Sequence, residues 1–399
     1  MTTPAQTLPI APAKAEAEFH VGEVTTIVGG HFVNDTFTSF TAPLLPLLIE
    51  KMSLSLTLAG SLWSFTQLPA LLNPFIGYLA DRVSLRYLVI FSPAVTVTAM
   101  SLLGLAPNYV TLALLLLLAG LGTAAFHAPS PPMVARVAGR RLGLAMSIYM
   151  SGGSLGYTLG PLVVVWVVSN WTLAGMVPLV AVGWATSLIM YWRLRRVPAR
   201  PQQRQNLRDI LPLARRLFLP LLAVIVPRTF LLTAVGVYMP TFIKEQGGSL
   251  WLAGASLSIW EFAGLFGGLL AGPLSDRIGR KSVMMVAIAA SSAIMLVLLN
   301  VQGWLLLPVL LALGFTAMSV IPVLMAMVQE GAPNHRSLAN GLFMSMIFLA
   351  GPLAAFFIGL LGDNFGLRVA FYVSTFVSLL AIPAVFWLPK GNSIGAARF

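Results

Sequence analysis

The sequence predicts an all-α membrane protein in which twelve transmembrane helices form two pseudo-symmetric six-helix bundles. Apolar residues make up 58% of the chain and charged residues 9%, whereas a soluble domain carries about 25% charged residues. The charged turn Asp81-Arg82 recurs as Asp276-Arg277, 195 positions later and almost half of the 399-residue length away. A repeated turn between apolar stretches indicates a duplicated membrane protein.

Composition also excludes several classes of function. The net charge of +12 would suit nucleic acid only on the basic face of a soluble domain, and here the basic residues lie in short gaps between apolar stretches, so we expect no nucleic-acid partner. The chain has no cysteine, which excludes disulfides, thiolate metal sites and cysteine nucleophiles. The first twenty residues lack the pattern of a cleaved secretory signal. With no nucleophile–base pair or metal constellation visible, we expect no enzyme.

Twelve apolar stretches are each long enough for one helix to span a bilayer, for which about 20 residues suffice. The predicted spans are 24–49, 54–80, 86–106, 109–133, 141–168, 171–194, 217–243, 250–274, 281–301, 303–328, 337–361 and 366–389. The predicted units are a cytoplasmic tail over 1–22, bundles over 23–194 and 217–390, a basic linker over 195–216 and a second cytoplasmic tail over 391–399.

The distribution of basic residues predicts the orientation, because cytoplasmic loops of membrane proteins are enriched in lysine and arginine. With both termini in the cytoplasm, 20 of the 24 basic residues fall on that side. Lys51, Lys244 and Arg368 fall outside, and Arg228 lies within a span. We therefore expect a multi-pass protein of the inner membrane, in contact with lipid, and a monomer.

The repeat extends beyond the charged turn, with offsets between 191 and 198. The matching positions are Asp35-Thr36-Phe37 with Arg228-Thr229-Phe230, Leu58-Ala59-Gly60 with Leu252-Ala253-Gly254, and Gly160-Pro161 with Gly351-Pro352. In transporters built from such repeats, the substrate site lies near the bilayer midplane where the halves face each other.

These features resemble the major facilitator superfamily over essentially the whole chain. Three stretches resemble its fosmidomycin-resistance group of exporters, and they are Gly30 to Asp35, Ala125 to Pro129, and Ser151 to Gly156 continuing to Gly160-Pro161. The resemblance implies the major facilitator fold and transport by alternating access. The arginine usual in the fourth helix of many drug/proton antiporters is replaced by leucine around Leu117.

The two charged turns allow two interpretations. Asp81, Arg82, Asp276 and Arg277 either cap helices and fix the orientation, or form latches in which each carboxylate accepts hydrogen bonds from a helix N-terminus or a neighbouring arginine. The resemblance favours the latch. In both cases we expect gating or structural residues, not substrate ligands.

Three ionisable residues lie deep within predicted spans, where their burial cost makes a functional role the default expectation. Asp35 lies in the first span, Arg228 in the seventh and Glu261 in the eighth. In one interpretation Arg228 binds an anionic substrate group while Asp35 or Glu261 takes the coupling proton. In the other, Asp35 and Arg228 approach each other as a fixed structural pair and only Glu261 titrates. Our hypothesis is that Asp35 is the main proton site.

Two histidines belong to the same question, because imidazole has a pKa near 6.5 and suits proton relay. His31 precedes Asp35 by four residues and shares its helical face. Asn34 adds to this polar cluster, and we expect it to bind substrate. His127 is either a substrate or relay residue, or is hydrogen-bonded to a backbone carbonyl in a helix kinked by nearby prolines. We expect no metal site, because no second ligand lies at suitable spacing within the helix of His127.

Gly156 and Gly160-Pro161 continue a four-residue glycine spacing in the fifth span. Small residues at that spacing permit close helix packing, and the stretch also resembles the antiporter-associated motif that seals one face of the cavity. Tyr238 and Trp260 are the aromatic residues that we expect in the cavity. Gln67 either adds polar cavity surface or forms an interhelical hydrogen bond.

We expect a secondary active transporter that exports a small anionic or amphipathic substrate in exchange for protons, with the proton gradient as energy source and no cofactor. Proton-coupled uptake of an organic anion is an alternative. A non-transporting receptor or lipid-handling protein is an alternative of another class.

Overall fold

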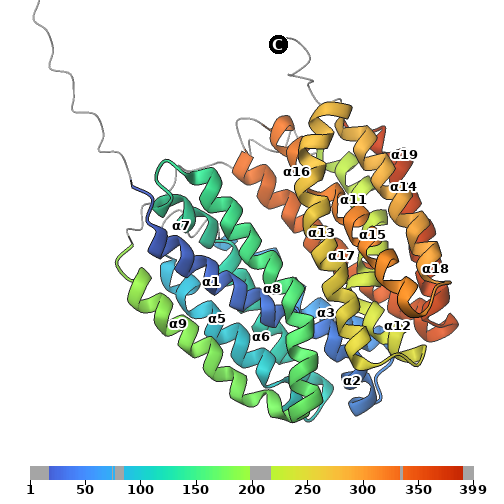
Figure 1. Ribbon diagram of the computed structural model, residues 1–399, viewed down its shortest axis with the longest axis horizontal. Coiled ribbons are helices and arrows are strands. Elements are labelled where there is room, and N and C mark those ends of the chain that lie inside the picture. Colours follow the sequence, from blue (N-terminus) through green and yellow to red (C-terminus); the bar gives the residue numbers. More distant parts are fainter. Residues whose placement is uncertain (1–17, 74, 77–84, 198–216, 333–335, 390–399) are drawn as a thin grey trace, which may run out of the picture.

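The computed structural model describes residues 18–73, 75–76, 85–197, 217–332 and 336–389. Every regular element in these ranges is a helix. Figure 1 shows two groups of helices side by side, the first built from residues before 198 and the second from residues after 216, with residues 41–67 of the first group lying against the second. The two-bundle, all-helical prediction is confirmed. The predicted linker over 195–216 and the two tails lie mostly outside the described ranges.

The first group contains α1 to α9 and has apolar cores on both sides of its centre. Its elements are α1 (Val21–Thr38), α2 (Thr41–Met52), α3 (Leu56–Gln67), η1 (Leu68–Leu72), α5 (Arg86–Ser101), η2 (Leu103–Leu105), α6 (Tyr109–His127), α7 (Ser130–Val137), α8 (Leu142–Trp171), η3 (Ala174–Leu179) and α9 (Val180–Leu194).

The second group contains α11 to α19 around two further apolar cores. Its elements are α11 (Leu219–Thr233), the π-helical turn η6 (Ala234–Tyr238), α12 (Met239–Glu245), α13 (Leu250–Ile278), α14 (Arg280–Leu298), η7 (Gly303–Leu305), α15 (Leu306–Met318), α16 (Val320–Gly331), α17 (Arg336–Phe365), α18 (Leu367–Leu379) and α19 (Ala381–Val385).

Ten helical segments of the described chain are long and apolar enough to cross a membrane. They correspond to the third to twelfth predicted spans. The first predicted span is divided into α1 and α2, and the second contains α3 and η1 and runs into residues outside the described ranges. Within the described residues, helices therefore occupy each of the twelve predicted spans, and several spans are divided into shorter helices.

Prolines account for the breaks within spans. A proline clashes with the carbonyl four residues before it and cannot donate to it. Pro43 stands four residues after Ser39, where α1 gives way to α2, and Pro322 stands four residues after Met318, where α15 gives way to α16. Pro131 stands four residues after His127, the last residue of α6. The fourth and tenth spans, which are repeat partners, are thus broken at comparable depth.

The two groups meet where α3 begins, close to α17, η6 and α12 (Figure 1). The Asp363 carboxylate accepts hydrogen bonds from the backbone of Leu56 (2.6 Å) and of Thr57 (2.9 Å). The Tyr238 hydroxyl lies 2.6 Å from the Ala355 carbonyl and 3.1 Å from that of Leu56. We call this region the closed end. It lies at the opposite end of the bundles from the start of α1 and the end of α19.

Glycines allow a second close approach between the groups. A Cβ atom on Gly254 of α13 would lie 3.1 Å from the Pro161 carbonyl oxygen and 3.4 Å from the Val165 Cβ of α8. Any larger side chain would push α8 and α13 apart. The seam between the halves therefore depends on backbone-to-backbone packing as well as on the polar contacts of the closed end.

Candidate functional site

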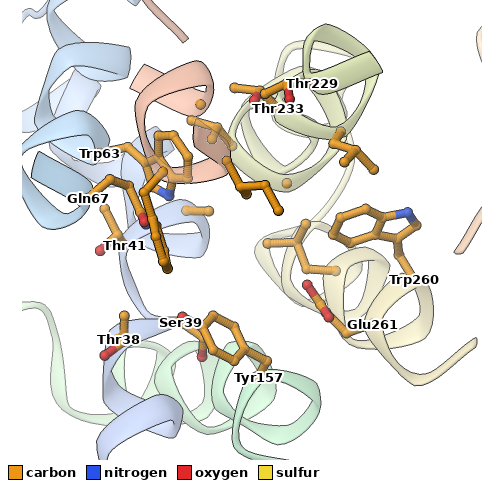
Figure 2. A pocket seen from close by; sticks show the side chains of 18 of the residues that line it. Thr38, Ser39, Thr41, Trp63, Gln67, Tyr157, Thr229, Thr233, Trp260 and Glu261 are labelled. Atoms are coloured by element: carbon orange, nitrogen blue, oxygen red, sulfur yellow. The ribbon is translucent and has the colours of Figure 1, made fainter. Parts of the chain in front are cut away.

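A cavity of about 250 Å³ lies between the two groups of helices. Both halves contribute to it, through α1, α2, α3 and α8 on one side and α11, η6, α13, α16 and α17 on the other. Figure 2 shows Trp63 and Gln67 facing Trp260 and Glu261 across this space, with Tyr157 beside them. Aromatic rings and threonine hydroxyls thus surround a central volume, as expected for a site between repeats.

Arg228 provides the cationic group of the cavity wall. Its side chain is buried, and Nη2 donates a hydrogen bond to the carbonyl oxygen of Ala317. Ala317 lies in the last turn of α15, where carbonyls lack helical donors, and α15 ends there because of Pro322. The break in the tenth span therefore supplies the acceptor that holds one side of the guanidinium. Within the described ranges Arg228 makes no other side-chain hydrogen bond or ion pair, so its other donors can bind a ligand.

Glu261 is the carboxylate of the cavity wall and belongs to α13. Among the described residues, its side chain has no hydrogen-bond or salt-bridge partner. Figure 2 shows its carboxylate directed into the space that Tyr157 also faces. A carboxylate in this position can exchange a proton with the cavity or hydrogen-bond a substrate.

Asp35 lies elsewhere, in a buried cluster inside the first half. Its Oδ2 is 3.1 Å from His31 Nε2, and its Oδ1 is 3.2 Å from His127 Nε2. The Asn34 amide also donates to Oδ1, at 3.2 Å. The expectation that Asp35 and Arg228 approach each other is therefore wrong for this conformation, because two histidines of its own half already occupy the aspartate carboxylate.

The position of His31 is fixed by three contacts. Its Nδ1 lies 2.8 Å from the backbone carbonyl oxygen of Tyr149. Its ring stacks on that of Tyr149 with centroids 4.1 Å apart, and Phe126 lies on it at 5.6 Å. The Tyr149 hydroxyl is itself 2.7 Å from Ser130 Oγ of α7. The imidazole is thus held between α6 and α8, with Nε2 directed at Asp35.

Glycines of α8 bring that helix against the cluster. A Cβ atom on Gly153 would lie 2.6 Å from the His31 ring and 2.8 Å from Asp35 Oδ2. A Cβ atom on Gly156 would lie 2.7 Å from the Phe32 carbonyl oxygen, and one on Gly160 would overlap Ser39 and Thr36. Gly156 and Gly160 therefore permit contact between α8 and α1, and Pro161 also lines the cavity.

The remaining predicted ligands are distributed differently from expectation. Gln67 and Trp260 line the cavity, as does Arg228. Tyr238, Asn34 and His127 do not: Tyr238 bonds at the closed end, and the other two belong to the Asp35 cluster. The prediction of these three as cavity residues failed because sequence position gives depth along a span but not which neighbour a side chain faces.

Sequence reasoning missed several cavity and contact residues. Thr38, Thr229 and Thr233 line the cavity, together with Trp63 and Tyr157. A threonine within a helix is not by itself a sign of a site. The one available signal for Thr38 was its position four residues after Asn34, on the same face of the helix as Asp35. Asp363 was also missed, because its partners lie 306 and 307 residues away in the other half.

The second charged turn forms an ion-pair network. Arg280 Nη2 lies 2.6 Å from Asp276 and 2.7 Å from Glu330, so it connects α13, α14 and α16. An arginine at the start of the neighbouring helix thus contacts the carboxylate, as the latch interpretation expects. Arg277 is exposed. Asp81 and Arg82 lie outside the described residues.

The sequence argument against a metal site considered the helix of His127 alone. The ligand atoms of His31, Asp35 and His127 lie within 4.8 Å of one another once α1 and α6 are brought together. That argument was therefore incomplete. The two contacts to Asp35 have hydrogen-bond lengths, and we describe the three side chains as a hydrogen-bonded cluster.

The sequence model of the Major Facilitator Superfamily matches residues 27–335 and 253–397. The chain belongs to this superfamily. Its members are transporters and not enzymes. The chain is 28% identical to the fosmidomycin resistance protein of Escherichia coli (strain K12), over 96% of this chain and 97% of that protein. It is 25% identical to the multidrug resistance protein MdtG of Yersinia enterocolitica, over 92% and 93% of the two chains.

Solved structures show the same fold. A bacterial homologue of the human lysosomal transporter Spinster, in an inward-facing and occupied conformation, superimposes with a TM-score of 0.77 at 16% identity, over 92% of this chain and 96% of that one. A D-xylose-proton symporter superimposes with a TM-score of 0.75 at 18% identity, over 94% and 99%. This chain is therefore a multi-pass membrane transporter of the major facilitator fold.

Proposed function

We propose that this transporter exports a small anionic or amphipathic compound in exchange for protons, by alternating access of the central cavity. The observation that carries the proposal is a cavity between the halves that combines Arg228, held on one side only, with a wall of aromatic rings. Arg228 suits a carboxylate, phosphate or phosphonate, because a guanidinium binds such groups through two parallel hydrogen bonds. Trp63, Tyr157 and Trp260 suit the apolar part of an amphipathic compound.

Export is supported by the relatives named for fosmidomycin and multidrug resistance. Proton exchange is supported by the chemistry of the ionisable groups. Glu261 faces the cavity. The Asp35 cluster lies in the same half as the cavity residue Thr38, and Asp35 precedes Thr38 by about one turn of α1. Ionisable groups within a membrane are costly and are retained for ion pathways.

The same charged groups would also serve uptake of an organic anion together with protons. One solved structure of similar fold is named as a proton symporter, so a protein of this fold can also carry its substrate in the same direction as protons. We place the protein in the inner membrane with both termini in the cytoplasm, on the basis of its lysine and arginine distribution, and we propose that it acts as a monomer surrounded by lipid.

Transport in vesicles of defined orientation tests the proposal. Purified protein is reconstituted, and a panel of radiolabelled organic anions is tested with an imposed pH gradient of either sign. We expect substrate to move opposite to the protons. Movement in the same direction would establish uptake instead, and an absence of ion-coupled flux for every compound would favour the non-transporting receptor or lipid-handling alternative.

Ligand binding provides a second test of the cavity. Thermal stabilisation by each anion is compared between the unmodified protein and Arg228→Ala, with Arg368→Ala as a control cation outside the cavity. We expect anions to stabilise the unmodified protein and the control but not Arg228→Ala. Equal stabilisation of all three would exclude Arg228 as the anion anchor.

A further inference from the structure

The hydrogen-bond partners of His31 determine which of its nitrogens carries a proton. Nδ1 lies 2.8 Å from the carbonyl oxygen of Tyr149, in a buried environment. A carbonyl oxygen only accepts hydrogen bonds, so Nδ1 must be the donor and carry a hydrogen. A neutral imidazole has a single N–H, and a neutral His31 therefore presents a bare lone pair at Nε2.

That lone pair faces another acceptor. Nε2 lies 3.1 Å from Asp35 Oδ2, and both side chains are nearly inaccessible to solvent, with 7% and 4% of their surface exposed. An ionised carboxylate is acceptor-only, so a neutral His31 and an ionised Asp35 would place two lone pairs against each other without water. The contact is satisfied only when a proton lies between the two atoms, on Nε2 or on Oδ2.

The other oxygen of Asp35 is already provided with donors. Oδ1 receives the Asn34 amide at 3.2 Å and lies 3.2 Å from His127 Nε2. The titratable groups in contact with the His31–Asp35 pair are thus His127 of α6 and Tyr149 of α8, and the Tyr149 hydroxyl is bonded to Ser130 of α7. No cationic side chain among these contacts removes the need for a proton at Oδ2.

We infer that the conformation closed at the Leu56–Asp363 contact is the proton-loaded state of the transporter, with one proton shared by His31 and Asp35. His127 is the path by which this proton exchanges, because 26% of its side chain is exposed whereas the pair is enclosed. The inference rests on the proposed proton-coupled function, to which it adds the residues that hold the proton and the conformation in which they hold it.

The pair is placed where its protonation can affect the packing of the halves. Gly153 of α8 contacts both members, and α8 also packs on α13 of the other half at Gly254. Loss of the proton would leave the two facing lone pairs unsatisfied, and one side chain would have to move against α8. Release of the proton is therefore expected to disfavour the closed end.

Distances across the closed end test this inference without a transport assay. The natural chain has no cysteine, so Leu105→Cys with Trp304→Cys provides two unique spin-label positions. Both residues are exposed and belong to different halves, in η2 and η7 at the closed end. Pulsed electron paramagnetic resonance then gives the ratio of short-distance to long-distance populations as a function of pH.

When the closed conformation binds one more proton than the open one, the ratio of closed to open molecules falls as the pH rises. The fall is tenfold for each pH unit between the pKa of the group in the open state and its pKa in the closed state. We expect this slope in the labelled protein and in Glu261→Gln. We expect no slope in Asp35→Asn, whose amide can donate to the bare Nε2 without a proton, nor in His31→Gln, whose amide can donate to an ionised Asp35. Both variants should remain closed at the highest pH tested.

An unchanged slope in both Asp35→Asn and His31→Gln, or no slope in the labelled protein, would overturn the inference. Loss of the slope in Glu261→Gln alone would assign the proton to the cavity carboxylate instead. The proposed function can fail separately from this inference. A pH dependence of the distance populations that requires Asp35, without proton-coupled flux in vesicles, contradicts the antiport proposal. Proton-coupled flux with a pH dependence that does not require Asp35 contradicts only this inference.

Discussion

The carboxylate of Asp363 caps the first turn of a helix in the opposite half through Thr57, which donates both its backbone N–H at 2.9 Å and its hydroxyl at 2.5 Å. The Leu56 N–H joins them at 2.6 Å. The first N–H groups of a helix have no helical acceptor, and a negative charge there also interacts favourably with the helix dipole. One side chain of α17 thus caps α3 in addition to the local cap Ser55, whose hydroxyl accepts from the Leu58 N–H at 3.2 Å, and holds the halves together.

We predict that Asp363→Asn weakens the closed end. The amide keeps one acceptor but loses the charge and the second oxygen. Loss of such a cap costs about 1 kcal/mol, which corresponds to about a fivefold lower ratio of closed to open conformations. The spin-label distance across Leu105→Cys and Trp304→Cys measures this ratio.

Asn364→Ala is the matched control for this prediction. Asn364 is the exposed neighbour of Asp363, and in the part of the chain that the structure describes its side chain bonds only to the Leu360 carbonyl of its own helix. The control should leave the distance distribution unchanged. The capping role of Asp363 would be refuted by equal distributions in Asp363→Asn and the unmodified protein.

Tyr238→Phe should weaken the same contact by a separate route. The Tyr238 hydroxyl is buried between the Ala355 and Leu56 carbonyls, and removal of a buried hydrogen bond costs about 1 kcal/mol. Both Tyr238 and Asp363 contact Leu56, and substitutions that share a partner are commonly non-additive by about 0.5–3 kcal/mol. The double variant should therefore differ from the sum of the single effects. Strict additivity in the distance measurement would show that the two contacts act independently.

Arg228→Lys should reduce binding of an anion although it keeps the charge. Lysine has one ammonium group and cannot form the planar two-bond contact of a guanidinium. It also cannot reach Ala317 and a ligand with the same geometry. A hydrogen bond between charged groups contributes about 1.5–3 kcal/mol, so we expect affinity to fall about 10- to 100-fold in a direct binding assay. Arg368→Lys, the same change at an arginine outside the cavity, serves as control, and affinity retained by Arg228→Lys would show that charge alone suffices.

Gly153→Ala should destabilise the protein, because the added methyl group would collide with His31 and Asp35. Overpacking of a core costs about 1–3 kcal/mol, and we expect a lower midpoint of thermal unfolding in detergent. Gly143→Ala lies in the same helix α8 and meets no atom within 4 Å. In a helix, alanine is favoured over glycine by about 1 kcal/mol, so this control should be neutral or stabilising. Equal midpoints for the two variants would contradict the close packing of α8 on α1.

Much of the fold follows from local features of the sequence. Apolar length predicts the spans, and the repeated Asp-Arg turn predicts the two halves. Proline positions were available as well, and the break at Pro322 could have been anticipated. Pro322 removes the donor to the Met318 carbonyl, so it did not indicate that Arg228 would bond to Ala317, one residue earlier.

The partners of the ionisable groups were less predictable. The depth of Asp35 in its span was sufficient to indicate a functional group, and the four-residue spacing indicated His31. The choice between Arg228 and His127 as a further partner depends on the rotation of α1 about its axis, which is set by glycine packing against α8. The capping of α3 by Asp363 depends on how two separately folded bundles meet, and no local pattern encodes that contact.

The break between α15 and α16 has an evolutionary consequence. The guanidinium of Arg228 bonds to a backbone carbonyl in the last turn of α15, that of Ala317, and no side-chain substitution deletes this atom. Substitution of the aromatic and hydroxyl residues around Arg228 leaves this hydrogen bond in place, and the histidine cluster in the opposite half keeps its own contacts. The lining of the cavity can therefore change over evolution without loss of the contact between Arg228 and Ala317.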